Sequence, residues 1–159
     1  MHIVLFEPEI PPNTGNAARL SAAFGLPLHL IEPLGFSLED KYLRRAGLDY
    51  WPSVRLFLWP DFAAYLREGR DGHRLVMTSC KTGSPIQRFA FSRADALVFG
   101  PESRGLPAEV LRHAGVCLRI PICDAVRSIN LSSAVAIAAY QAMLGSGMLD
   151  ELPQRPKEH

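Results

Sequence analysis

Residues 7–19 carry an arginine and two asparagines at the point where a first apolar run gives way to a helical pattern. Asn13 and Asn16 flank Gly15, and Arg19 follows three residues after Asn16. Asparagines and backbone N–H groups at a helix start can bind a polar ligand, and the guanidinium fork of arginine suits phosphate. A capped turn with a merely solvated Arg19 would have the same sequence, so both interpretations stay open.

A second polar segment, residues 99–107, follows another apolar run and holds two glycines and two prolines, which fix its backbone path. Gly100 would let a flat ligand approach the main chain closely. Glu102 and Arg104 supply the charged groups of this segment. The alternative is a surface turn in which the two charged residues form an internal salt bridge.

A third polar segment, residues 119–133, runs from an apolar stretch into a helical pattern. Ser128 or Asn130 can cap that helix, because their side-chain oxygens accept hydrogen bonds from its first N–H groups. Residues 134–139 are so rich in small side chains that another element must pack closely against them. An ordinary core helix with an ordinary cap is the alternative.

Two further segments have weaker patterns. Lys41, Arg44 and Arg45 fall on one face of a short helix, which predicts either a phosphate-facing patch or a solvated charged face. Residues 78–83 follow an apolar run and form either another ligand-lining loop or an ordinary one. The sequence contains no phosphate-loop, dinucleotide-binding or hydrolase-elbow motif, and its five histidines stand singly without metal-ligand spacing.

The composition is that of one folded domain: 159 residues, 48% hydrophobic and 21% charged, with a net charge of +1. These values exclude disorder or coiled coil as a description of the whole chain. Arginine provides 14 of the 17 basic residues, which suits RNA contacts, although a GC-rich genome would have the same effect. Without a membrane-length apolar stretch, a visible signal peptide or paired cysteine spacing, we expect a cytoplasmic protein.

The elements that must position the polar segments alternate in type. Short apolar runs predict buried strands at residues 2–6, 28–31, 54–58, 75–77, 96–99 and 116–120. Helical patterns lie between them, at residues 13–24, 62–68, 108–113 and 130–144, with Asn13, Asp61 and Pro107 placed to begin the first three. This alternation predicts an α/β domain with a mostly parallel sheet, over residues 1–146, and a flexible tail over residues 147–159.

The order of the three polar segments is specific. The motifs N-x-G-N-x-x-R, F-G-P-E-S-R-G-L-P and R-I-P-x-x-x-x-x-R-S-x-N-L-S closely resemble those of the SPOUT-class RNA 2′-O-methyltransferases. The chain looks most like the small enzymes of this class that methylate the wobble nucleotide, position 34, of tRNA, because residues 3–19, 31–36 and 43–50 also match. The match extends to about residue 144, with one departure at residues 81–83, where relatives run from lysine straight into glycine.

The resemblance implies a mostly parallel α/β fold with a deep C-terminal trefoil knot, over roughly residues 75–144. The knot would hold S-adenosylmethionine in a bent form, and no metal is implied. Matching the motifs gives the expected cofactor contacts as Thr78 (or Met77), Gly100, Ile120, Ile122, Ser128 and Leu131. The resemblance also implies a homodimer, with the C-terminal helix at the interface and an active site shared between subunits.

Ribose methylation is an in-line displacement that needs removal of the 2′-hydroxyl proton. The base proposed in the family corresponds to Arg19, but a guanidinium stays protonated, so we expect Arg19 to grip the neighbouring phosphate and stabilise the developing alkoxide. Glu102 or a phosphate oxygen would help with the proton, and Asn16, Glu102 and Asn130 would hold the geometry. The residues expected to contact the tRNA are Arg44, Arg45 and Arg104.

Two alternatives to this function remain. One is the same chemistry on ribosomal RNA or on another tRNA position. The other is a non-catalytic RNA-binding protein of the same fold, which the polar residues kept in all three segments disfavour.

Overall fold

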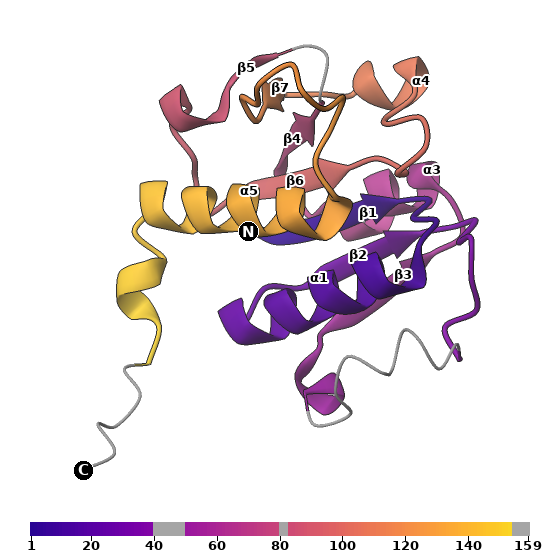
Figure 1. Ribbon diagram of the computed structural model, residues 1–159. Helices are drawn as coiled ribbons and strands as arrows, with labels where there is room; N and C mark the ends of the chain where they lie inside the picture. The colour runs from indigo at the N-terminus through magenta and orange to yellow at the C-terminus, as the bar shows by residue number, and fades with distance from the viewer. Residues whose placement is uncertain (40–49, 80–82, 154–159) are drawn as a thin grey trace.

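The computed structural model describes residues 1–39, 50–79 and 83–153, whose strands form a single seven-stranded sheet (Figure 1). All pairings are parallel, in the order β3-β2-β1-β6-β4-β7-β5. The strands are β1 (His2–Phe6), β2 (Leu28–Ile31), β3 (Leu56–Trp59), β4 (Arg74–Thr78), β5 (Ser84–Pro85), β6 (Asp95–Phe99) and β7 (Val116–Arg119). The predicted α/β class and parallel sheet are confirmed.

Helices cover both faces of the sheet. On one face, α1 (Pro11–Phe24) and α5 (Leu131–Gly145) lie side by side and share one apolar core with the strands (Figure 1). On the other face, the cover consists of α3 (Phe62–Ala64), a π-helical turn (Tyr65–Gly69) and α4 (Ala108–Leu111). Short 3₁₀ turns occur at Trp51–Ser53, Ile86–Arg88 and Leu149–Glu151. The central strands β1, β4 and β6 are therefore buried from both sides.

An apolar stripe of helical spacing runs along α5. Leu131, Val135, Ala138 and Ala142 are all buried. The small side chains among them allow α5 to pack closely on α1 and on the sheet. Of the two candidate caps, Asn130 begins α5, because its Oδ1 accepts the amides of the second and third helical residues.

All six predicted strands are present, with ends displaced by two residues at most. Their apolar runs identified them because strands covered on both faces are apolar throughout. Strand β5 was not predicted, since it consists of one serine and one proline and has no apolar run. It pairs with the edge of β7.

The start of α1 differs from the prediction. The helix begins at Pro11, where the fixed φ of proline suits the first turn, and Asn13 does not cap it. The side chain of Asn13 donates instead to Glu102. Asp61 caps α3 as expected, and a short helix follows Pro107 as expected.

Part of the predicted C-terminal tail lies on the domain surface. Leu149–Glu151 form a 3₁₀ turn, and Glu151 forms an ion pair with Arg93. Met148 and Leu152 pack against the core on the α1 and α5 side. Residues 154–159 lie outside the described residues, as does the segment 40–49 that carries the predicted basic patch.

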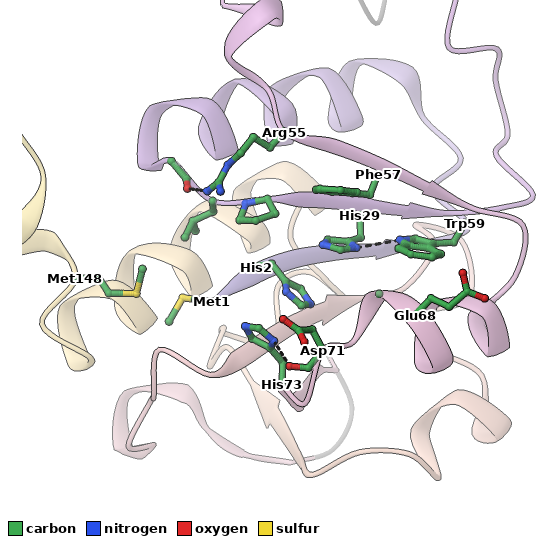
Figure 2. A pocket seen from close by; sticks show the side chains of 14 residues that line it. Met1, His2, His29, Arg55, Phe57, Trp59, Glu68, Asp71, His73 and Met148 are labelled. Carbon is green, nitrogen blue, oxygen red and sulfur yellow. Dashed lines mark hydrogen bonds between the residues drawn. The ribbon is translucent and has the colours of Figure 1, made fainter.

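Histidine and aromatic rings stack at the amino-terminal ends of β1 and β2 and line a hollow of about 560 Å³ (Figure 2). The ring of His2 lies 4.3 Å from that of His29 and 4.4 Å from that of His73, between centroids. Trp59 Nε1 donates to His29 Nδ1 at 2.9 Å, and His2 Nε2 lies 2.8 Å from the Tyr65 hydroxyl. Hydrogen bonds thus fix two of the stacked imidazoles.

Burial in this stack keeps the two inner imidazoles neutral. Desolvation, aided by the neighbouring histidines, lowers the pKa of His2 to about 3 and that of His29 to about 4. In the unfolded chain both groups titrate near a pKa of about 6.5. Between these values the unfolded chain binds protons that the folded chain does not.

We therefore predict that acid destabilises the fold as the pH falls from about 6.5 towards about 4. The free energy of unfolding should fall by about 1.4 kcal/mol per pH unit for each of the two histidines, because protons then bind the unfolded state preferentially. Urea titrations across this pH range measure the slope. His29→Gln, whose amide can still accept from Trp59, should flatten it.

His113→Gln is the matched control, because His113 is exposed and lies outside the stack. It should leave the slope unchanged. A His29→Gln variant with the wild-type slope would contradict the assignment.

Candidate active site

The three polar segments meet at one edge of the sheet. Residues 7–10 follow β1, residues 100–107 follow β6 and residues 120–130 follow β7. Because all strands are parallel, these segments leave the sheet at its carboxyl edge, where open α/β folds bind ligands. The stacked histidines lie at the opposite ends of the strands.

Glu102 ties the loop after β6 to the start of α1. Its Oε2 accepts the amide of Glu9 at 2.9 Å. Its Oε1 accepts the Nδ2 group of Asn13 at 2.9 Å and the amide of Ile10 at 3.3 Å. Both carboxylate oxygens therefore bind the protein's own donors, which fits a geometry-holding role better than acceptance of a substrate proton.

Asn13 extends this connection to the third segment. Its buried side chain accepts a hydrogen bond from Asn130 Nδ2 at 2.7 Å. Asn130 Oδ1 in turn accepts the amide of Ser132 at 2.9 Å and its hydroxyl at 2.7 Å. One chain of hydrogen bonds, which we call the Glu102–Asn13–Asn130 chain, thus joins all three segments.

Sequence reasoning missed the connecting role of Asn13. At a helix start an asparagine is most simply explained as a cap, and its partners lie 89 and 117 residues away in the chain. The only sequence signal was its place in the N-x-G-N-x-x-R motif.

A second set of contacts crosses between the first two segments. Ser103 donates its amide to Glu9 Oε2 at 2.9 Å and its hydroxyl to Oε1 at 2.6 Å, and these bonds lower the pKa of the Glu9 carboxyl. Arg104 forms an ion pair with Glu7. The internal salt bridge between Glu102 and Arg104 that the sequence allowed is therefore replaced by contacts to the first segment.

The backbone of Glu7 is strained where β1 ends. Its φ is +47°, in the left-handed region that side chains disfavour. The side chain of Glu7 forms the ion pair with Arg104. Arg104, a predicted RNA-contact residue, therefore lies at the carboxyl edge of the sheet. Strained backbone of this kind concentrates at functional sites.

Asn16 and Arg19 lie on the exposed side of α1. The guanidinium carbon of Arg19 lies 5.6 Å from the centroid of the Tyr50 ring. The Tyr50 hydroxyl donates to the carbonyl oxygen of Gly15 at 3.1 Å. Both side chains are exposed to solvent on this helix.

Three of the residues expected to bind the cofactor lie at the carboxyl ends of neighbouring strands. Thr78 ends β4, Gly100 follows β6 and Ile120 follows β7, and β6, β4 and β7 are neighbours in the sheet. The Thr78 hydroxyl donates to the carbonyl of Val98 at 3.0 Å. A Cβ on Gly100 would lie 2.4 Å from the amide nitrogen of Leu106, so the loop's own fold already requires glycine there.

The segment after Ile120 presents apolar groups to solvent. Residues 121–128 are all exposed, Ser128 among them, and Ile122 and Val126 are 37% and 54% exposed. Leu131, in contrast, is buried at the start of α5.

Between the two alternatives at the end of β4, Thr78 is the accessible one. Met77 is completely buried in the sheet, whereas Thr78 is partly exposed at the strand end. Within the described ranges, no group of histidine, cysteine, aspartate or glutamate residues could hold a metal ion. In that same part of the chain, no helix has the length and apolarity needed to cross a membrane.

Comparison with known proteins places the chain in a family. Residues 1–140 match the model of the SpoU rRNA Methylase family. The chain belongs to this family. The tRNA (cytidine(34)-2'-O)-methyltransferase of Escherichia coli K12 is 46% identical over 144 residues, which cover 89% of this chain and 91% of the relative.

Solved structures of the family share the fold. A structure from work on 2-OH methylation of C/U34 on tRNA matches with a TM-score of 0.86 and 51% identity, and covers 91% of this chain and 94% of that chain. The AdoMet complex of the SpoU methyltransferase AviRb from Streptomyces viridochromogenes matches with a TM-score of 0.80 at 21% identity, over 91% of this chain and 59% of that chain. These matches confirm the resemblance inferred from the three segments.

We predict that Asn13→Ala destabilises the protein by about 1–3 kcal/mol, because it removes one partner each from Glu102 and Asn130 in a partly buried network. Asn16→Ala, three residues further on and exposed, should change stability by less than about 0.5 kcal/mol. Urea denaturation of both variants measures the difference. Equal losses in the two variants would show that the chain of hydrogen bonds does not hold the segments together.

Proposed function

We propose that the protein transfers a methyl group from S-adenosylmethionine to the 2′-hydroxyl of the wobble nucleotide, position 34, of tRNA. The joining of all three family motifs at the carboxyl edge by the Glu102–Asn13–Asn130 chain carries this proposal. The identity of 46% to a tRNA (cytidine(34)-2'-O)-methyltransferase, over 89% of the chain, supports the substrate and position.

In this proposal the cofactor binds at the carboxyl ends of β6, β4 and β7. Ile120 is partly exposed and Ile122 is exposed, so both would offer apolar surface to a purine ring. The residues that would hold the cofactor are Thr78, Gly100, Ile120, Ile122, Ser128 and Leu131. When bound there, S-adenosylmethionine supplies a methyl group on a positively charged sulfur.

The chain's own residues then orient the ribose. A guanidinium carries hydrogen-bond donors and no acceptor, so Arg19 grips the phosphate and stabilises the negative charge that develops on the 2′-oxygen. The Glu102 oxygens are occupied by backbone and Asn13 donors, which leaves a phosphate oxygen of the RNA as the proton acceptor. Asn16 and Asn130 hold the geometry around the ribose.

The active form is a homodimer in this proposal. Ile137, Tyr140 and Leu144 are 44%, 53% and 56% exposed and share one face of α5. Exposed apolar residues gathered on one helix face mark an interaction surface, and a second copy of α5 would cover it. The C-terminal knot and the cytoplasmic location also remain predictions.

One assay tests the function. Purified protein is incubated with methyl-labelled S-adenosylmethionine and total tRNA from a strain that lacks its own wobble methylase, and the label is mapped by nuclease digestion and mass spectrometry. Label on the ribose of nucleotide 34 supports the proposal. Label elsewhere in tRNA, or only on ribosomal RNA, overturns the position or the substrate, and absence of both label and cofactor binding favours the non-catalytic alternative.

We predict that Arg19→Lys lowers the single-turnover methylation rate by about 10²–10³-fold, because lysine cannot present the same fork of donors to a developing charge. Arg67→Lys, an exposed arginine on the opposite face of the sheet, should leave the rate unchanged. Full activity of Arg19→Lys would remove the guanidinium geometry from the mechanism.

We predict that Tyr140→Glu yields a monomer, because a charge in the centre of the apolar face of α5 opposes its burial. Light scattering behind size-exclusion chromatography measures the mass. Arg112→Glu, on the far side of the sheet, serves as the control and should remain dimeric. A Tyr140→Glu protein of unchanged dimeric mass would place the interface elsewhere.

A further inference from the structure

Tyr50 contacts α1 at two points within a single helical turn. Its hydroxyl donates to the Gly15 carbonyl at 3.1 Å, and its ring centroid lies 5.6 Å from the guanidinium carbon of Arg19. In an α-helix the carbonyl of residue 15 also accepts the amide of residue 19, so Tyr50 spans the turn that carries Arg19. The 3₁₀ turn that follows Tyr50, Trp51–Ser53, packs against the same helix.

We propose that Tyr50 is a positioning residue for Arg19 in methyl transfer. Its ring holds the guanidinium in place by a cation–π contact, which acts within about 6 Å of the ring centroid. Its hydroxyl anchors that ring to the helix backbone. The inference rests on the proposed function, in which Arg19 grips the phosphate beside the reacting ribose.

The geometry suits a group that must bind an anion. A guanidinium interacts with an aromatic ring through its flat face, whereas it donates hydrogen bonds from its edges. Contact with Tyr50 is therefore compatible with a fork of hydrogen bonds to phosphate. Because arginine has a long, flexible side chain, orienting it before the RNA arrives reduces the ordering cost of binding.

Glycine at position 15 is part of this arrangement. Glycine is a poor helix former, yet Gly15 lies within the first half of α1 and is buried. The Gly15 carbonyl, which accepts from Tyr50, and the Arg19 side chain therefore lie about one turn apart on the same helix.

Two substitutions at Tyr50 separate the ring from the hydroxyl. Tyr50→Leu removes both, and we expect the single-turnover methylation rate to fall by at least about threefold, the factor that corresponds to one exposed cation–π contact. Tyr50→Phe keeps the ring and should stay within about twofold of wild type. Trp51→Leu removes the neighbouring aromatic, whose ring lies 6.3 Å from that of Tyr50, and should also leave the rate within about twofold.

A double variant tests whether Tyr50 acts through Arg19. In an Arg19→Ala background, Tyr50→Leu should cause no further loss, because the group that it positions is already gone. Multiplicative losses in the double variant would overturn the proposal. So would a Tyr50→Leu rate within about twofold of wild type.

A spectroscopic measurement reports the contact without any activity. The Tyr50 ring shields the Arg19 side chain, so its NMR signals should move towards unstructured values in Tyr50→Leu and stay shifted in Tyr50→Phe. Unchanged signals in Tyr50→Leu would show that the contact does not form. Thermal melting of each variant confirms that it is folded.

Failure of this inference is distinguishable from failure of the proposed function. Wild-type protein that leaves nucleotide 34 unmethylated overturns the function, and with it the role of Tyr50. An active wild type with an equally active Tyr50→Leu variant overturns the role of Tyr50 alone.

Discussion

The carboxylate of Glu102 is the interaction on which the site depends. Parallel strands deliver three segments to one edge of the sheet, but they leave the backbone of each segment free to take many paths. Three hydrogen bonds to Glu102 fix the first segment against the second, and Asn13 passes the connection to Asn130 at the start of α5. Because partly buried polar groups lose stability when a partner is missing, the three segments keep one shared conformation.

The two ends of the strands use polar side chains in opposite ways. At the carboxyl edge, polar groups bind one another across segments and leave Asn16 and Arg19 on the exposed side of α1. At the amino-terminal ends, His2 and His29 are buried, neutral and hydrogen-bonded to aromatic partners. The second arrangement stabilises the sheet, whereas the first builds a surface that a charged ligand can approach.

Most of the fold followed from local patterns, because strands covered on both faces are apolar throughout and α5 has an apolar stripe of helical period. The strands could therefore be predicted from the sequence. Hydrogen-bond and ion-pair partners that lie far apart in the chain could not be predicted in this way. Nothing local distinguishes a capping Asn13 from a bridging one, and nothing near Arg104 shows that it pairs with Glu7. The two-residue β5 lacks any apolar run.

Methyl transfer requires loops that keep one conformation and a cationic side chain that can bind the phosphate of the RNA. The Glu102–Asn13–Asn130 chain holds the loops in place, since its members bind one another and the backbone. A phosphate-binding arginine must instead stay reachable from solvent, where no buried network can hold it. An aromatic ring solves this conflict, because it orients a guanidinium through its face and leaves the hydrogen-bonding edges to a ligand. Tyr50 contacts Arg19 through its ring and the Gly15 carbonyl through its hydroxyl. Both contacts are made to α1, the helix whose first turn is held by hydrogen bonds to Glu102.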